Sequence, residues 1–149
     1  MLEPNDYVWG CDVKAAFKAL SLHPAWHLCA VFRQRDPRDG VMKYWLPTRM
    51  MFGLTSAPGG FSLLSAEARQ ILSRVFNCPV WAYLDDFRGG AAFKPAASAQ
   101  LALTKQFLAS LGLDTADDKD ELPSRKARVI GVLMHLSTRW RRRCRFRRR

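Results

Sequence analysis

The 149-residue chain lacks any long apolar run. No stretch approaches the roughly 20 consecutive apolar residues that a membrane-spanning helix needs. The polar beginning, MLEPND, is unlike a secretory signal peptide. The hydrophobic fraction, 48%, is that of a chain that folds around a core. We therefore expect a soluble intracellular protein, in the cytoplasm or nucleus, with no membrane partner.

The sequence also lacks paired cysteines and histidine metal-binding motifs. None of its four cysteines forms a CxxC pair. Three of them lie in apolar stretches, which favours buried free thiols over a disulfide frame or a zinc site. His23 and His27 are four residues apart, but Pro24 disfavours a helix between them and no HExxH glutamate is present. This spacing is therefore weak support for a metal site.

Acidic residues are few, and most of the basic excess lies at the C-terminus. The net charge is +11, and residues 139–149, RWRRRCRFRRR, contain eight arginines. Without them, 16 basic and 13 acidic residues remain, a net charge of +3. Such a run, here with Arg141, Arg142 and Arg143, is typical of segments that bind nucleic-acid phosphates or anionic surfaces, or direct nuclear import. A solvated, disordered tail over residues 137–149, without a dedicated partner, is the alternative.

Hydrophobic periodicity predicts a mixed pattern of strands and helices over residues 1–136. DYVWGCD predicts a buried strand that ends at Asp12, and two helices are expected over 57–76 and 96–111. The apolar segments 27–32 and 41–47, separated by RQRDPRDG, predict a β-hairpin. Further strands are expected over 80–84, 87–93, 113–116 and 129–133, with Asp85-Asp86 as a tight turn.

Apolar stripes give each predicted helix a core-facing side. Ser56 can cap the first helix, and Gly112 suits the C′ position of the second. The expected core residues of the two helices are Phe61, Leu64, Ala68, Ile71, Leu72 and Val75, and then Leu101, Leu108 and Leu111.

With the first hairpin set aside as an insertion, the order of elements is that of an α+β, ferredoxin-like (split βαβ) fold. In this fold the strands ending at Asp12 and Leu84 run parallel, with the 87–93 strand between them. Asp12 and Asp85 would then lie at the same edge of the sheet, where neighbouring strands are about 4.8 Å apart. We therefore expect Asp12, Asp85 and Asp86 to converge. No internal repeat or interdomain linker is evident.

Converging carboxylates without a histidine suit hard cations, above all Mg²⁺. Two such ions can hold the attacking and leaving oxygens of a phosphoryl transfer. An exposed hairpin turn is the alternative for the Asp85-Asp86 pair, because aspartate is a common turn residue. Glycoside hydrolysis needs carboxyl groups about 5–9.5 Å apart across a cleft, which adjacent residues on a tight turn fit poorly.

Four segments, in order, resemble the motifs of reverse transcriptases. YLDD (83–86) resembles the YxDD box, and CDVKAAFKALSLHP (11–24) resembles the segment around the first catalytic aspartate. MFGLTSAPGGF (51–61) is similar to the FGLxxAPxxF stretch, and LGLDTADDK with IGVL (111–119, 130–133) to the region after the YxDD hairpin. The FGL…AP form is most like gypsy-like or DIRS-like retrotransposon enzymes. The resemblance covers residues 6–134, the palm subdomain.

The resemblance implies a two-metal site. Asp12 and Asp85 would bridge two Mg²⁺ ions, with Mn²⁺ as a substitute, and Asp86 would complete the acidic cluster. The Val13 carbonyl would be a further ligand. One ion would lower the pKa of the primer 3′-hydroxyl, and the other would neutralise the triphosphate and the leaving pyrophosphate.

The resemblance also implies nucleotide contacts. Phe17 would select deoxynucleotides by blocking a ribose 2′-hydroxyl, and Phe52 and Gly53 would pack against the incoming nucleotide and template. Lys119 would lie near the nucleotide phosphates and protonate the leaving group. Tyr83 would support the primer end. Core packing for Phe17 and Phe52, and an exposed lysine without a role for Lys119, are the alternatives.

The implied activity is RNA-directed DNA polymerisation, which adds dNTPs to a primer 3′-end on an RNA or DNA template. Reverse transcriptases also have fingers and thumb, and often RNase H regions. No part of this sequence resembles these regions. We therefore expect an incomplete fragment of a retroelement polyprotein that polymerises poorly, if at all, by itself, because positioning supplies much of the rate. A catalytically inactive remnant that binds nucleic acid through its arginine-rich tail is the alternative function.

Overall fold

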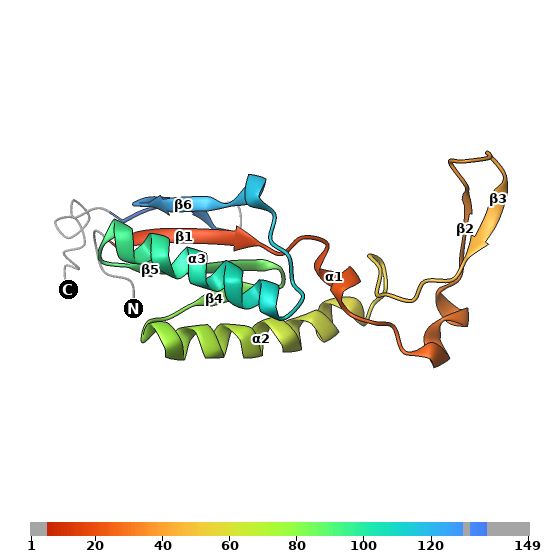
Figure 1. Cartoon of the computed structure of the whole chain (residues 1–149), viewed down its shortest axis with the longest axis horizontal. Coiled ribbons are helices and arrows are strands. Elements are labelled where there is room, and N and C mark those ends of the chain that lie inside the picture. The colour runs from red at the N-terminus through yellow and green to blue at the C-terminus, as the bar shows by residue number, and fades with distance from the viewer. Residues whose placement is uncertain (1–5, 130–131, 137–149) are drawn as a thin grey trace, which may run out of the picture. The chain divides into compact units, whose positions relative to one another are not determined.

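The computed structural model describes residues 6–129 and 132–136. The chain divides into two compact units, residues 1–14 with 65–149 and residues 15–64. Each is described here by itself, with its elements labelled in Figure 1. The predicted tail over 137–149 lies outside the described residues. The single palm subdomain expected over 1–136 stays a prediction.

The first unit contains a four-stranded antiparallel sheet. Its strands are β1 (Tyr7–Asp12), β4 (Trp81–Tyr83), β5 (Asp86–Ala91) and β6 (Glu121–Ser124), in the order β4-β5-β1-β6 (Figure 1). Both β1 and β4 pair antiparallel with β5, so they run parallel to each other with β5 between them. This is the strand order that the sequence predicted for these three strands.

The edge strand beside β1 is not the predicted one. Residues 113–116 form only an isolated bridge, between Thr115 and Val13, and β6 pairs with β1 instead. The reason is that β1 ends at Asp12, so that residues 113–116 run past its end and have no strand left to pair with. The chain then turns through η3 (Asp117–Lys119) and returns along β1 as β6.

The strand predicted over 129–133 is divided between two strands. Val129 ends β7 (Lys126–Val129), and Val132 begins β8 (Val132–His135). These two residues are paired across the antiparallel β7–β8 sheet, so the prediction of one continuous strand is wrong. Residues 130–131 of the predicted strand lie outside the described residues.

Two helices cover one face of the four-stranded sheet. They are α2 (Ala57–Phe76), which has the predicted bounds, and α3 (Lys94–Ser110). Trp9 of β1 touches both, because its Nε1 donates to Gln100 Oε1 of α3 at 2.9 Å and its ring meets Phe76 of α2 edge-on at 6.5 Å. No helix of the described residues is long and apolar enough to cross a membrane.

The buried stripes of the helices differ in part from the predicted ones. In α2, Ile71 and Val75 are exposed, Val75 by 68%, and in α3 Leu111 is exposed at the helix end. Ile71 and Leu72 are about 100° apart around the helix, so only one of them can point at the core. The buried residues are Ala57, Phe61, Ser65, Ala68 and Leu72 in α2, and Ala97, Leu101, Thr104 and Leu108 in α3.

The end of α3 follows the sequence prediction. Gly112 has a φ of 74°, the left-handed conformation that glycine adopts without a steric cost. Its N–H donates to the Ala109 carbonyl at 2.9 Å, and the next N–H, of Leu113, donates to Leu108 at 2.9 Å. These bonds satisfy carbonyl groups that the helix end leaves free.

The second unit is built from short elements. It contains α1 (Ala16–Ala19), η1 (Pro24–Trp26), η2 (Leu28–Ala30), β2 (Phe32–Arg35) and β3 (Met42–Trp45). The strand predicted over 27–32 is wrong, since residues 28–30 form a 3₁₀ turn and Leu28 is exposed. The predicted hairpin forms closer to its turn, where the polar residues of β2 pair with β3.

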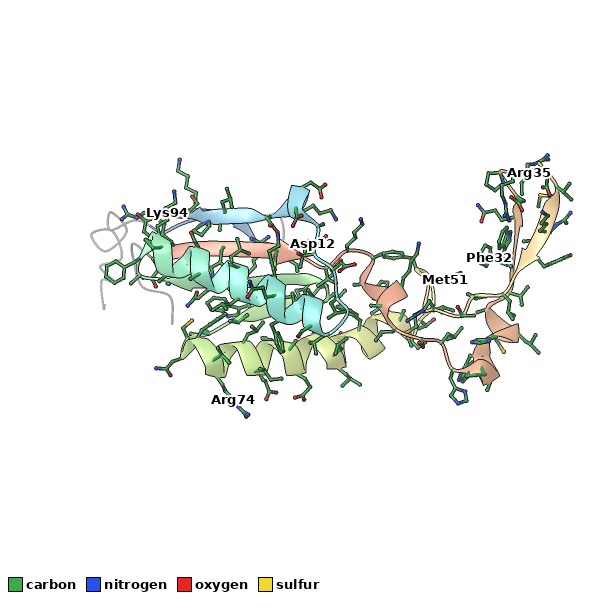
Figure 2. All side chains as sticks on the ribbon, in the orientation of Figure 1. Asp12, Phe32, Arg35, Met51, Arg74 and Lys94 are labelled. Carbon is green, nitrogen blue, oxygen red and sulfur yellow. The ribbon has the colours of Figure 1, made fainter. Side chains whose placement is uncertain are left out.

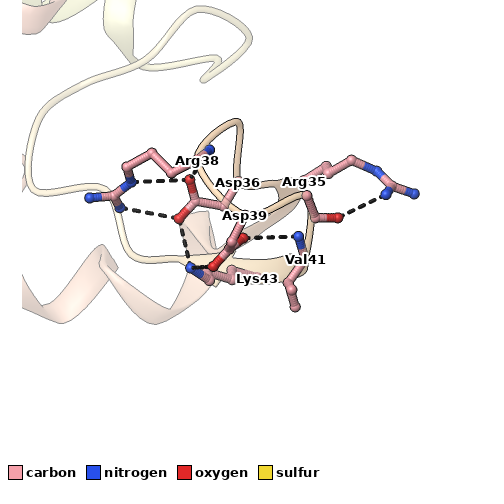
Figure 3. A network of polar contacts seen from close by, with 7 residues as sticks. Arg35, Asp36, Arg38, Asp39, Val41 and Lys43 are labelled. Carbon is pink, nitrogen blue, oxygen red and sulfur yellow. Dashed lines mark hydrogen bonds and ion pairs between the residues drawn. The ribbon is translucent and has the colours of Figure 1, made fainter.

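A buried carboxylate holds the β2–β3 turn together (Figure 3). The Asp36 side chain is fully buried and accepts hydrogen bonds from the backbone and guanidinium of Arg38 and, at 2.7 Å, from Lys43 Nζ. Lys43 also pairs with Asp39, whose Oδ1 accepts the Val41 N–H at 2.9 Å. The hydrogen bonds from Arg38 and Lys43 lower the pKa of Asp36 to about 2.

We predict that Gly89→Ala destabilises the first unit. A Cβ at position 89 would lie 2.4 Å from Trp9 Cζ2, well inside contact distance. Overpacking of this kind lowers the free energy of unfolding by about 1–3 kcal/mol, which urea denaturation measures. Gly59→Ala is the matched control, because nothing lies within 4 Å of its Cβ position in α2. The control should be neutral or stabilising, and an equal loss in both variants would contradict the packing argument.

We also predict that the hairpin turn loosens in acid. The folded pKa of Asp36, about 2, is below its ordinary value of 3.8. The network therefore contributes stability above pH 3.8 that is lost as the pH falls toward 2. The amide resonance of Arg38, which donates to Asp36 Oδ1, should titrate with a midpoint near pH 2. Asp36→Asn should lack this transition, and a midpoint near 3.8 in the parent chain would refute the prediction.

Candidate active site

The pairing of β1 with β5 brings three aspartates to one end of the sheet. Asp12 lies directly opposite Asp86, and the N–H of Val13 donates to the Asp85 carbonyl at 2.9 Å. The aspartates that the strand order predicted to be neighbours are therefore neighbours along the backbone. Their catalytic and metal-binding roles stay predictions.

The turn between β4 and β5 lies one residue earlier than predicted. Tyr83 pairs with Asp86, so the two turn residues are Leu84 and Asp85. Leu84 has a φ of 53°, a left-handed conformation that a two-residue hairpin turn requires. Asp85 is thus a turn residue, and Asp86 is the first residue of β5. The turn therefore positions the Asp85 side chain, and β5 positions the Asp86 side chain.

Lys119 forms an ion pair with Asp12. Its Nζ donates to Asp12 Oδ2 at 2.7 Å, and this bond raises the pKa of Lys119. The backbone sets the geometry, because the Ala116 N–H donates to the Asp12 carbonyl and the Lys119 N–H to the Ala116 carbonyl, both at 2.9 Å. The Lys119 side chain is largely exposed, so this ion pair faces solvent.

Arg88 links Asp86 to Glu121 across strand β1. Its Nε donates to Asp86 at 3.0 Å, and its two terminal nitrogens donate to the Glu121 carboxylate at 2.7 and 2.9 Å. Gly10 of β1 pairs with Arg88 on one side and with Glu121 on the other. A Cβ at Gly10 would lie 3.1 Å from Arg88 Nη1, so the absence of a side chain lets the guanidinium cross.

Sequence reasoning missed both Arg88 and Glu121. A signal for Arg88 was available, since side chains two residues apart in a strand share a face and Asp86 is such a neighbour. No local signal indicated Glu121. It meets Arg88 only because β6 pairs with β1.

Burial and mutual repulsion affect the acidic residues. Partial burial raises the pKa of the Asp85 carboxyl and of the Asp86 carboxyl, and the charge of Asp12 raises both further. Lys119 opposes this increase at Asp85, as Arg88 does at Asp86. The three carboxylates are therefore electrostatically coupled, and positive charge beside them is favourable.

No metal-binding constellation is formed by the described side chains. Among residues 6–129 and 132–136, no group of three His, Cys, Asp or Glu side chains is arranged to hold a metal ion. The carboxylates of Asp12 and Asp86 are turned to Lys119 and Arg88 instead. His27 Nε2 bonds to the Leu22 carbonyl.

The three cysteines among the described residues are free thiols in three different environments. Cys11 is buried, and burial raises its pKa to about 12. Cys78 is half-buried and Cys29 is exposed, so the prediction of buried thiols is wrong for Cys29. Cys29 lies within the 3₁₀ turn η2 rather than in the predicted strand.

Three of the predicted nucleotide contacts, Phe17, Phe52 and Gly53, belong to the second unit. The Phe17 and Phe52 rings meet edge-on with centroids 4.9 Å apart, and Phe17 also contacts Phe61. Phe17 is buried, whereas Phe52 is 73% exposed and has its ring free for a further contact. Gly53 follows with a φ of 93°, in an exposed turn.

The remaining predicted site residues are distributed as follows. Val13 is buried beside the aspartates, and Tyr83 is exposed at the end of β4. Arg141, Arg142 and Arg143 lie outside the described residues.

Comparison with solved structures identifies the fold. The crystal structure of prototype foamy virus protease-reverse transcriptase matches 90% of this chain with a TM-score of 0.71 at 18% sequence identity. A foamy viral protease-reverse transcriptase in complex with dsDNA matches 92% of it with a TM-score of 0.68, also at 18% identity. The chain has a reverse transcriptase-like fold.

This reverse transcriptase-like fold rests on structure alone. No protein-family model matches the chain, and no curated protein sequence matches it. The chain spans 17% and 27% of the two foamy viral chains.

We predict that the two cations of the site differ in their effect on stability. Arg88→Met would leave Asp86 and Glu121 without their shared, largely buried partner, and should lower the free energy of unfolding by about 1–3 kcal/mol. Lys119→Met removes an exposed ion pair and should cost less than about 1 kcal/mol. Urea denaturation of both variants tests this, and an equal or reversed order would contradict the assigned geometry.

Proposed function

We propose that the chain is the palm of an RNA-directed DNA polymerase of retrotransposon type, which adds dNTPs to a primer 3′-end. The observation that carries the proposal is the meeting of Asp12, Asp85 and Asp86 at one end of the sheet in a reverse transcriptase-like fold. In this reading β1, α2, β4, β5 and α3 form a split βαβ palm, and the β2–β3 hairpin is an insertion in it.

The chemistry of the donor atoms, rather than their present arrangement, suits Mg²⁺, or Mn²⁺ in its place. Asp12, Asp85 and Asp86 offer only carboxylate oxygens, which hard cations prefer. Burial first, and then the charge of Asp12, raises the pKa of Asp85 and of Asp86, so added positive charge would favour their ionised forms. Two bound ions would activate the primer 3′-hydroxyl and neutralise the triphosphate.

Two cationic side chains would serve this chemistry differently. Arg88 donates hydrogen bonds to both Glu121 and Asp86, so it would keep the Asp86 carboxylate in a fixed orientation. Lys119 is exposed and protonated, so it could leave Asp12 and donate a proton to the departing pyrophosphate. The Val13 carbonyl would be an additional ligand.

Further residues would bind the substrates. Phe17 would restrict the sugar 2′ position, and the exposed ring of Phe52, next to Gly53, would pack against the nucleotide. The template and primer, RNA or DNA, would contact Tyr83 and the arginines 141–143. A foamy viral neighbour was solved with dsDNA, which supports a nucleic-acid partner. Fingers, thumb and RNase H regions of a longer polyprotein would supply the remaining contacts that hold the duplex.

Primer extension tests the function. With the chain in excess over an RNA template annealed to a DNA primer, and with Mg²⁺ or Mn²⁺, we expect single-nucleotide addition that Asp12→Asn and Asp85→Asn abolish. Asp114→Asn is the matched control, since it removes an exposed carboxylate of the same unit. Broadening of the Val13 and Asp86 amide resonances by Mn²⁺ reports metal binding independently of turnover.

Two outcomes would overturn the proposal. One is incorporation that survives Asp85→Asn. The other is a folded parent chain that neither adds a nucleotide nor shows Mn²⁺ broadening near Asp12, which would leave the inactive, nucleic-acid-binding remnant as the function.

A further inference from the structure

The β2–β3 hairpin has one face on which all four side chains are exposed. In its register Arg33 is opposite Tyr44 and Arg35 is opposite Met42, and these four side chains share a face because strand residues alternate. All four are exposed, Tyr44 by 75% and Met42 by 41%. Phe32 and Trp45, on the opposite face, are only partly exposed. We call the four residues the Arg33–Tyr44 face.

This face carries uncompensated positive charge. The two carboxylates of the hairpin, Asp36 and Asp39, are both taken by Arg38 and Lys43 (Figure 3). Within the described part of the chain, neither Arg33 nor Arg35 forms an ion pair. Arg35 donates to the Gly40 carbonyl at 2.8 Å and extends away from the Asp36 network (Figure 3). Figure 2 labels its position near the hairpin turn.

We propose that the Arg33–Tyr44 face binds single-stranded nucleic acid. Residues directly opposite in an antiparallel pair have Cβ atoms about 4.5–5.5 Å apart, so Arg33 and Tyr44 can meet the phosphate and the base of one nucleotide. Arg35 and Met42 repeat the combination of a cation with an apolar surface one step along the hairpin. A cationic groove with exposed aromatic rings is the chemistry that binds single strands.

A single strand fits this face better than the other polyanions do. Tyr44 can stack only on a base that is not already paired and stacked in a duplex, and base–aromatic stacking is sequence-tolerant. An acidic peptide would satisfy the arginines but would give the Tyr44 ring no π-face to stack on. The polar turn and the small apolar area likewise make insertion into a lipid surface unfavourable.

The hairpin is stiff enough to serve as a binding surface. An isolated two-stranded hairpin is marginally stable. Here Lys43 bridges Asp36 and Asp39, and the Asp36 N–H donates to the Val41 carbonyl at 2.8 Å, which closes the turn. Arg33 and Tyr44 are thus held on paired strands before a ligand arrives, which lowers the entropy lost on binding.

The inference deepens the proposed function, because it names a surface for the nucleic-acid partner. Its test needs no catalysis. Fluorescence anisotropy of a labelled 20-nucleotide oligouridine with the full chain, in EDTA, measures binding alone. A chain that binds through this face, but neither adds a nucleotide nor shows Mn²⁺ broadening near Asp12, overturns the proposed function and leaves this inference standing.

We expect Tyr44→Ala to weaken oligouridine binding by about 5- to 150-fold, the range for one lost stacking contact. Tyr44→Phe, which keeps the ring, should bind like the parent. The double variant Arg33→Ala/Arg35→Ala should reduce the slope of log K against log salt concentration by about 1.4, since each single-strand phosphate contact contributes about 0.7. A 20-base-pair duplex should bind without dependence on Tyr44.

The matched control is Arg74→Ala/Lys94→Ala, which removes the same charge from exposed positions on α2 and α3 (Figure 2). A parallel series with Arg141, Arg142 and Arg143 changed to alanine separates the hairpin from the basic tail, and the losses caused by the hairpin variants should persist in it. Three results would each overturn the inference. These are equal losses in the hairpin and control doubles, no effect of Tyr44→Ala, and equally good competition by polyglutamate.

Discussion

The register of β1 against β5 is the constraint on which the first unit depends. Trp9 lies opposite Gly89, where no side chain could be accommodated beneath the indole ring. On the other face of the same strands, Gly10 lies opposite Arg88 and Asp12 opposite Asp86. A slip of one residue would turn each of these side chains to the wrong face. The burial of one tryptophan over a glycine therefore also fixes which charges meet on the opposite side of the sheet.

The acidic cluster is balanced by two cations that are held very differently. Arg88 is largely buried, is bonded to Asp86 and Glu121, and crosses β1 where glycine leaves room for it. Lys119 reaches Asp12 from an exposed 3₁₀ turn. Displacing Arg88 would remove the largely buried cation that Asp86 and Glu121 share, whereas Lys119 can exchange Asp12 for water at little cost. A cation that enters this site would therefore replace Lys119 at Asp12 more easily than Arg88 at Asp86.

Different interactions stabilise the two units. The first unit is organised by buried apolar side chains, with Trp9, Phe87 and Leu108 fully enclosed. In the second unit the hairpin is held by charged groups around Asp36, and Tyr44 and Met42 are left in solvent. A turn fixed by ion pairs needs little apolar burial, so the side chains of its strands are free to face outward. That division is what makes the Arg33–Tyr44 face a surface rather than a core.

The sequence by itself determined the elements whose signals are local and periodic. The sequence predicted the β1 strand, the bounds of α2, the end of α3 before Gly112 and the presence of a hairpin before α2, because each depends on neighbouring residues and on hydrophobic period. The proximity of Asp12 to Asp85 and Asp86 followed from strand order. Only the tertiary structure decided that residues 113–116 are not a strand, because that depends on where β1 stops. It also decided that Glu121 pairs with Arg88. These residues are far apart in sequence, and they come together only because β6 pairs with β1.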